Sequence, residues 1–267
     1  MARSDAFEAR ESERVSTYRL LATDDALSQD LLGPDAADLA AASLAMARRF
    51  ASGATLWCAA PSWPWHAQHV VLDFVHPVIA GERSLPAVMV SGDHLWESLR
   101  PIARAGDMLL VVSRSDEPSV AGLRQRSKAW GVLTVWIGTG PRPEPGSADF
   151  VLWVDDDETV SSYGGRFALL YHLLSELTRV CLGNPGLLEA EQAVCGDEVC
   201  ITCSDEGRLG EIVSLQPDGL AQVRTPSGIK TVDASLVDAR AGDLVLIHAG
   251  AAVSLVLSES REPEEAP

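Results

Sequence analysis

A histidine and a carboxylate four residues apart, His69 and Asp73, form the first pair in this chain that could do chemistry. They fall in a stretch whose apolar spacing predicts a helix over residues 66–75, and side chains four residues apart share one face of a helix. An imidazole beside a carboxylate suits general acid–base chemistry or the binding of a divalent metal ion. The simpler alternative is that Asp73 only orients a half-buried His69, and we favour it because such pairs occur readily on helices.

A second set of reactive side chains consists of thiols near the end of the chain. Cys195, Cys200 and Cys203 have a C-x4-C-x2-C spacing, which is similar to part of an iron–sulfur ligand run. A cluster or a structural zinc would need a fourth ligand nearby, and only Cys58 and Cys181 remain. We therefore predict no permanently bound cofactor, and we interpret Cys203 as a structural residue or an accessory thiol.

Short β-type segments follow these thiols. Runs of β-branched and aliphatic residues occur at 210–215, 220–225, 229–232 and 245–250, with turn residues between them. Four or five short strands at this spacing predict a small, closed or half-closed, OB-like β-barrel. Cys200 precedes the first of these strands and His248 lies in the last run.

Apolar strands alternate with amphipathic helices in the rest of the chain. The expected strands cover residues 54–60, 87–91, 108–113, 132–138 and 150–154, and the expected helices cover residues 34–50, 66–75, 94–103, 118–130 and 160–181. The alternation predicts an α/β fold, with a parallel sheet covered by helices on both faces. Ligands of such sheets bind at the carboxyl ends of the strands.

Composition excludes some classes of function. The net charge of −17 argues against nucleic-acid binding, since phosphates would be repelled. The first residues contain no hydrophobic signal, and the longest apolar run, residues 244–257, is too short to span a bilayer. We expect a cytoplasmic protein with no membrane association, whose 5 cysteines do not form disulfides.

Changes of composition along the chain predict five parts. They are a disordered or loosely packed segment (1–29), the α/β domain (30–182), a linker (183–199), the barrel (200–258) and a disordered acidic tail (259–267).

The barrel segment resembles the HypC/HupF family of hydrogenase-maturation chaperones. The likeness is carried by Cys200, by Gly210-Glu211-Ile212-Val213, by residues 228–232 and by the run from Gly242-Asp243 to His248-Ala249-Gly250. It implies binding to an assembly protein of the HypD type and to the precursor of a [NiFe]-hydrogenase large subunit. Cys200 would carry or transfer an Fe(CN)2CO fragment, for which thiolate is a suitable ligand. His248 would be a hydrogen-bond partner, a transient ligand or a core histidine. Cys200 lies inside the chain, whereas the family's cysteine follows the initiator methionine, so no α-amino group can act beside it.

Residues 30–182 resemble the sugar-isomerase (SIS) domain, nearest to its phosphoheptose isomerase branch. The likeness is carried by Ala67-Gln68-His69, by residues 106–115 and by residues 167–177, which include His172. It implies a metal or acid–base cluster of His69, Asp73 and His172, and a homo-oligomer. The remaining partner in the family would fall near Gly164, which has no side chain to offer.

The phosphate-side loops depart from that family. The first loop, residues 59–65, contains two prolines and two tryptophans where the family has glycines whose backbone N–H groups approach an oxyanion. Asp116 and Glu117 in the second loop would repel a phosphate. Hydroxyl groups remain as vestigial phosphate ligands at Ser62, Ser113, Ser115 and Ser119.

The sequence thus predicts a maturation chaperone or scaffold, rather than an enzyme, whose SIS-like domain serves dimerisation or docking. The alternative is a phosphosugar isomerase of the sedoheptulose 7-phosphate type, or a sugar-phosphate sensor, that uses His69, Asp73 and His172.

Overall fold

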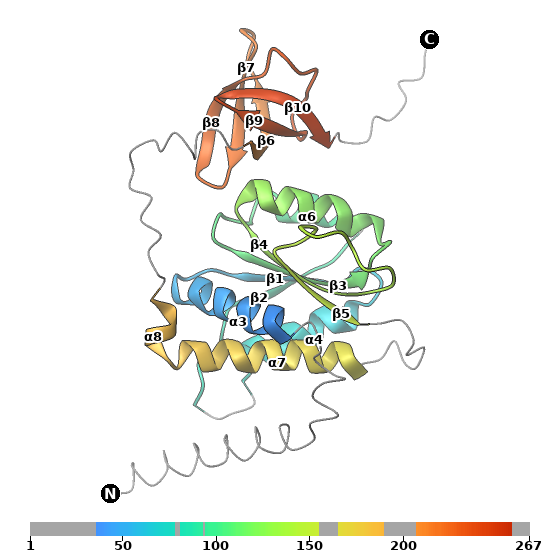
Figure 1. Cartoon of the computed structure of the whole chain (residues 1–267), viewed down its shortest axis with the longest axis vertical. Coiled ribbons are helices and arrows are strands. Elements are labelled where there is room, and N and C mark those ends of the chain that lie inside the picture. The colour runs from blue at the N-terminus through green and yellow to red at the C-terminus, as the bar shows by residue number, and fades with distance from the viewer. Residues whose placement is uncertain (1–35, 78–80, 93, 155–164, 190–206, 258–267) are drawn as a thin grey trace, which may run out of the picture.

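The computed structural model of the chain describes residues 36–77, 81–92, 94–154, 165–189 and 207–257. Figure 1 shows an α/β body and, beyond helix α6, a small body made of strands. The α/β body contains a parallel sheet and the second body is a closed five-stranded barrel. The predicted combination of an α/β fold and a separate small β-barrel is therefore confirmed.

The sheet of the α/β domain has the strand order β2-β1-β3-β4-β5. Its strands are β1 (Leu56–Ala59), β2 (Ala87–Val90), β3 (Met108–Arg114), β4 (Leu133–Thr139) and β5 (Phe150–Val154). The central strand β3 is buried from Met108 to Ser113, as its continuous apolar run predicts for a parallel strand covered on both faces.

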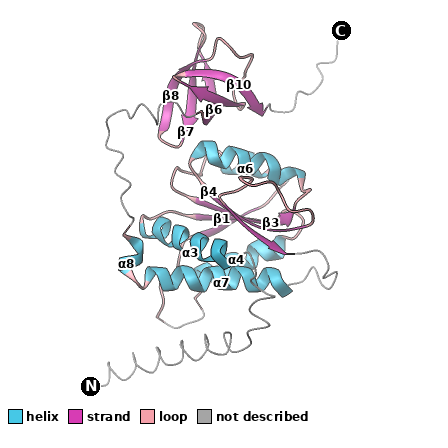
Figure 2. Cartoon of the chain, viewed as in Figure 1, coloured by secondary structure: helices cyan, strands magenta, loops and turns pink. Residues whose placement is uncertain are grey.

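Helices cover both faces of this sheet (Figure 2). Helices α3 (Ala36–Ala51), α4 (Pro64–Val75) and α7 (Gly165–Leu182) pack on one face, and α5 (Leu95–Leu99) and α6 (Pro118–Trp130) pack on the other. A single turn, α8 (Pro185–Leu188), follows α7. Helix α6 begins at Pro118 and ends at Trp130. The next residue, Gly131, is its C-cap and has a left-handed conformation with a φ of 71°.

Helix α5 is shorter than the helix predicted over residues 94–103. It ends at Leu99, with Arg100 as its C-cap, directly before Pro101. Proline has no N–H to donate to the helix, which explains the early end. No helix in the described parts of the chain combines the length and the apolar character needed to cross a bilayer.

The barrel has the strand order β10-β8-β7-β6-β9. Its strands are β6 (Arg208–Leu215), β7 (Leu220–Thr225), β8 (Gly228–Asp233), β9 (Leu244–His248) and β10 (Ala251–Leu257). The single apolar run predicted at 245–250 is the end of β9 and a turn, and β10 begins directly after it. Ala249 and Gly250 form that turn, with φ values of 49° and 83°.

The barrel packs against the side of the α/β domain formed by α5 and α6. Leu244 of β9 is fully buried in the same apolar cluster as Leu123 and Trp130 of α6. Arg224 of β7 donates hydrogen bonds to the carbonyl oxygens of Arg100, at 2.8 Å, and Ala103. The two bodies are therefore joined by both apolar and polar contacts.

Candidate functional site

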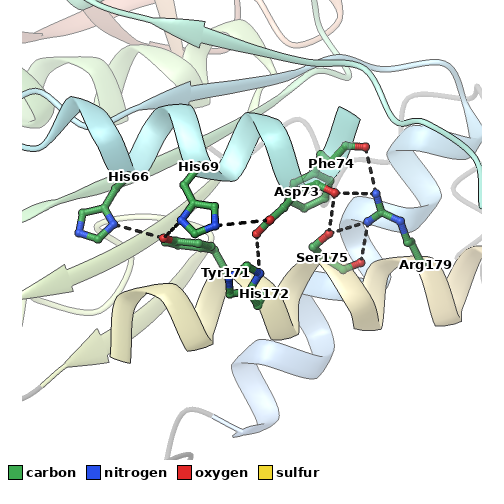
Figure 3. Close-up of polar contacts among 8 residues, drawn as sticks. All are labelled: His66, His69, Asp73, Phe74, Tyr171, His172, Ser175 and Arg179. Carbon is green, nitrogen blue, oxygen red and sulfur yellow. Dashed lines mark hydrogen bonds and ion pairs between the residues drawn. The ribbon is translucent and has the colours of Figure 1, made fainter. Parts of the chain in front are cut away.

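The candidate site lies between helices α4 and α7, which pack against each other on one face of the sheet (Figure 3). Helix α4 supplies His69 and Asp73, and α7 supplies His172. His69 and Asp73 share one face of α4, as their spacing of four residues predicts, and this face is directed toward α7. The structure thus brings together the three residues predicted for a metal or acid–base cluster.

Asp73 is the centre of this cluster. Its Oδ2 lies 2.7 Å from Nδ1 of His172, and its Oδ1 lies 3.8 Å from Nε2 of His69. The carboxylate side chain is only 11% exposed, whereas the two imidazoles are 47% and 44% exposed. The carboxylate is therefore held inside while both rings remain accessible from solvent. Asp73 contacts His172 more closely than His69, so it does more than orient His69.

Tyr171 connects the site to a second histidine of α4. Its hydroxyl oxygen lies 2.9 Å from Nδ1 of His69 and 3.4 Å from Nδ1 of the buried His66. The contact fixes the His69 ring with its Nε2 directed toward Asp73. Sequence reasoning missed Tyr171, although its position next to His172 and the spacing of His66 one turn before His69 were available signals.

Burial governs the ionisation of the site. It raises the pKa of Asp73 above its ordinary value, against the lowering effect of positive charge on His172, His69 and Arg179. Burial and the negative charge of Asp73 together raise the pKa of Tyr171 to about 12. Tyr171 therefore stays protonated at neutral pH and can donate a hydrogen bond to a histidine nitrogen.

Arg179 fixes the end of helix α4 that carries Asp73. Its Nη2 donates hydrogen bonds to the carbonyl oxygens of Asp73, at 2.7 Å, and Phe74, at 3.0 Å. Its Nε lies 3.2 Å from a carboxylate oxygen of Glu82. The guanidinium is nearly buried and satisfies carbonyls in the last turn of α4, which have no partner within the helix. Asp73 is thus positioned by contacts to its own backbone.

The donor set of the cluster fits a divalent transition metal. One ligand atom from each of His69, Asp73 and His172 lies within 4.8 Å of the others. Two imidazole nitrogens and a carboxylate oxygen are a common catalytic zinc set, which leaves one position open for water or substrate. With a metal ion on Nε2 of His69, the Nδ1–H of this ring would donate to the hydroxyl oxygen of Tyr171, which is the kind of outer contact that orients a ligating histidine.

A pocket of about 630 Å³ opens at the carboxyl ends of β1 and β2, where the fold predicts a ligand. Ser62 from the loop before α4, Trp96 from α5, and Glu117 and Ser119 from the start of α6 are among the residues that line it. Unlike Trp96, which lines the pocket, Trp130 and Trp136 are buried in the apolar core.

The four predicted phosphate ligands do not come together. Ser62 and Ser119 line the pocket, but Ser113 and Ser115 do not. Ser113 is fully buried and its Oγ accepts a hydrogen bond of 3.0 Å from the indole of Trp136. Ser113 is thus directed into the core and does not line this pocket, and its role as a phosphate ligand stays a prediction.

The residues predicted for iron transfer are only partly within the described chain. Cys195, Cys200 and Cys203 lie outside the described residues, as does Gly164. His248 is the last residue of β9. Cys58, in β1, is fully buried, and burial raises the pKa of its thiol. Cys58 is therefore an unreactive core residue and no candidate for a metal ligand.

Comparison with solved structures shows which known fold the α/β domain resembles. No protein-family model matches the chain, and no curated protein sequence does. The chain is similar in structure to a phosphoheptose isomerase from Francisella tularensis, with 15% sequence identity and a TM-score of 0.51, over 64% of this chain and 98% of that one. A phosphoheptose isomerase from Neisseria gonorrhoeae matches over the same shares, with 16% identity and a TM-score of 0.47. The α/β domain thus resembles the SIS fold of phosphosugar isomerases.

Proposed function

We propose that the α/β domain binds a sugar and interconverts its aldose and ketose forms at His69, Asp73 and His172. The observation that carries this proposal is the shared carboxylate of Asp73, which joins two imidazoles from two different helices. The reaction is that of the alternative predicted from the sequence, a phosphosugar isomerase of the sedoheptulose 7-phosphate type, but the proposal leaves open whether the sugar carries a phosphate. The other form of this alternative is a sensor, which would bind the same sugar without converting it.

The chemistry of isomerisation suits these groups. Converting an aldose to its ketose moves one proton from C2 to C1 and a second from the C2 hydroxyl to the C1 oxygen, so the site needs a base and an acid close together. Imidazole titrates near neutral pH and can take either role. Asp73 contacts the rings of both His69 and His172 and stabilises whichever of them is protonated. A divalent ion held by the three residues would supply polarisation of the sugar carbonyl.

Proton abstraction can be tested by hydrogen exchange. The full chain is incubated with sedoheptulose, and separately with its 7-phosphate, in D2O, and NMR follows deuterium entering the carbons beside the carbonyl. We expect exchange by the wild-type protein, and a loss of at least a hundredfold in His172→Ala and Asp73→Asn. Glu144→Gln, which changes an exposed carboxylate elsewhere, is the control and should exchange like wild type. Equal exchange in all four proteins would sink the proposal.

Hydrogenase maturation is the second candidate, and it concerns the barrel. It is supported by a closed five-stranded barrel directly after the segment that contains Cys200, with His248 at the end of one of its strands. In this candidate function the barrel binds a HypD-type assembly protein and the large-subunit precursor, and Cys200 helps transfer the Fe(CN)2CO fragment. The α/β domain would then serve docking or self-association.

An anaerobic pull-down separates the two candidates. The protein is used as bait in its native host, and infrared spectra of the eluate are recorded in the cyanide and carbonyl stretching region. Maturation predicts such bands together with an assembly partner, and their loss in Cys200→Ser. Normal hydrogenase maturation in a host that carries only Cys200→Ser would exclude this role.

A further inference from the structure

A carboxylate of the protein itself occupies the place where two hydroxyl donors converge in the pocket at the ends of β1 and β2. Ser62 Oγ donates a hydrogen bond to Oε2 of Glu117, and Ser119 Oγ donates one of 2.9 Å to Oε1 of the same residue. The two serines come from different segments: Ser62 lies in the loop before α4 and Ser119 in the first turn of α6. Both oxygens of Glu117 are therefore engaged by groups that could otherwise bind an external anion.

The backbone around the pocket offers few donors in their place. Pro61 and Pro64 in the first loop and Pro118 at the start of α6 have no N–H group. The N–H of Trp63, between the first two, donates to the carbonyl of Ala60 at 3.1 Å. Anion sites at loop and helix starts depend on several backbone N–H groups directed at the ligand. The three prolines therefore leave this pocket with fewer backbone N–H groups that could bind an anion.

The charge of Glu117 also acts directly on a ligand. Glu117 is the N-cap of α6, so its carboxylate lies where the helix dipole favours negative charge. The positive end of the dipole is therefore already balanced by Glu117 and attracts a further anion less strongly. A phosphate brought into the same pocket would face this carboxylate at short range and would find both serine hydroxyls occupied. The hydroxyl groups of an uncharged sugar, in contrast, can donate to Glu117 and accept from the serines.

We propose that this pocket takes an unphosphorylated sugar and that Glu117 takes the place of the ligand's phosphate. The inference rests on the proposed function, which it makes more specific: the reaction is sugar isomerisation, and the substrate carries hydroxyl groups and no phosphate at this end. Trp96, which also lines the pocket, provides the apolar wall that small-molecule sites combine with a few polar groups.

Matched ligands test this selectivity on the full chain. Isothermal titration calorimetry compares sedoheptulose with sedoheptulose 7-phosphate on the wild-type protein, on Glu117→Gln and on the control Glu144→Gln. We expect the wild type and the control to bind the free sugar at least tenfold more tightly than its phosphate. Glu117→Gln removes the charge and keeps the shape, and we expect it to gain at least tenfold in affinity for the phosphate.

The outcomes separate this inference from the isomerase proposal. Tighter binding of the phosphate by the wild type would overturn the inference and leave the isomerase proposal standing, and this holds even if Glu117→Gln does not fold. Tight binding of the free sugar without deuterium exchange would support the inference and overturn the isomerase proposal. If neither sugar binds the wild-type protein, both are overturned.

Discussion

Glu211 of the barrel accepts a hydrogen bond of 2.7 Å from the indole Nε1 of Trp130, the last residue of helix α6 in the α/β domain. Arg126, also on α6, donates to the other oxygen of Glu211 at 2.9 Å, and Arg100 lies 3.3 Å from that oxygen. The side chains of Glu211 and Arg126 are only 1% and 3% exposed. A buried carboxylate therefore joins the barrel to the α/β domain.

Removing this carboxylate should weaken the joint. Glu211→Ala leaves the Arg126 guanidinium buried without its charge partner, and breaking a buried ion pair in this way costs about 3–5 kcal/mol. We expect a lower midpoint of urea unfolding, measured by tryptophan fluorescence, and faster proteolysis between the domains. Glu97→Ala is the control, because its carboxylate is 55% exposed and should cost less than about 0.5 kcal/mol. Equal midpoints for the two variants would contradict a stabilising role for Glu211.

If His69, Asp73 and His172 bind a divalent metal ion, replacing one of them should lower the affinity for that ion. Asp73→Asn and His172→Ala each remove one of three ligands that lie within 4.8 Å of one another. We expect both variants to bind Co2+ at least tenfold more weakly than wild type, followed by its visible absorption, since even changes around a ligand cost about 10–100-fold. His76→Gln changes an exposed histidine three residues from Asp73 and should bind like wild type. Unchanged binding in Asp73→Asn would remove the carboxylate from the ligand set.

The sequence was informative at two places where the determining contact is local. The apolar run from Met108 to Ser113 predicted a buried strand because the side chains of a central parallel strand are covered on both faces. The spacing of His69 and Asp73 predicted their common helix face, because four residues make about one turn. In both cases neighbouring residues in the sequence decide the structure.

Contacts between distant segments escaped prediction. The bond between Tyr171 and His69 joins residues 102 positions apart, and it exists only because α7 packs on α4. The contact between Arg126 and Glu211 joins residues 85 positions apart in different domains. Glu211 was assigned to a strand of the barrel, but no local pattern indicates that its side chain is buried against another domain. Predicting such pairs requires the packing of the elements first.

The crowding around Gly138 in β4 predicts a large effect of a single methyl group. A Cβ at this position would lie 2.4 Å from the Trp153 ring and 3.0 Å from Nε1 of Trp136. Gly138→Ala should therefore destabilise the protein by about 1–3 kcal/mol, the usual range for overpacking a core. Gly165→Ala, at the start of α7, meets no atom within 4 Å and should be neutral or stabilising by up to about 1 kcal/mol. Urea unfolding measures the free energy of unfolding of both variants. Equal values would contradict the prediction and would mean that Trp136 and Trp153 move aside to make room for the methyl group.

The protonated state of Tyr171 gives the site a dependence on alkaline pH. Burial and the charge of Asp73 raise the pKa of Tyr171 to about 12 in the folded protein, from an ordinary value of about 10. Because the folded-state pKa is the higher one, the stabilisation is fully present below pH 10 and is lost as the pH rises through 12. Tyr171→Phe cannot ionise, so the stability advantage of wild type over this variant should be larger at pH 8 than at pH 11. Thermal unfolding in the presence of EDTA measures both differences. An advantage that is the same at both pH values would show that the Tyr171 hydroxyl titrates normally.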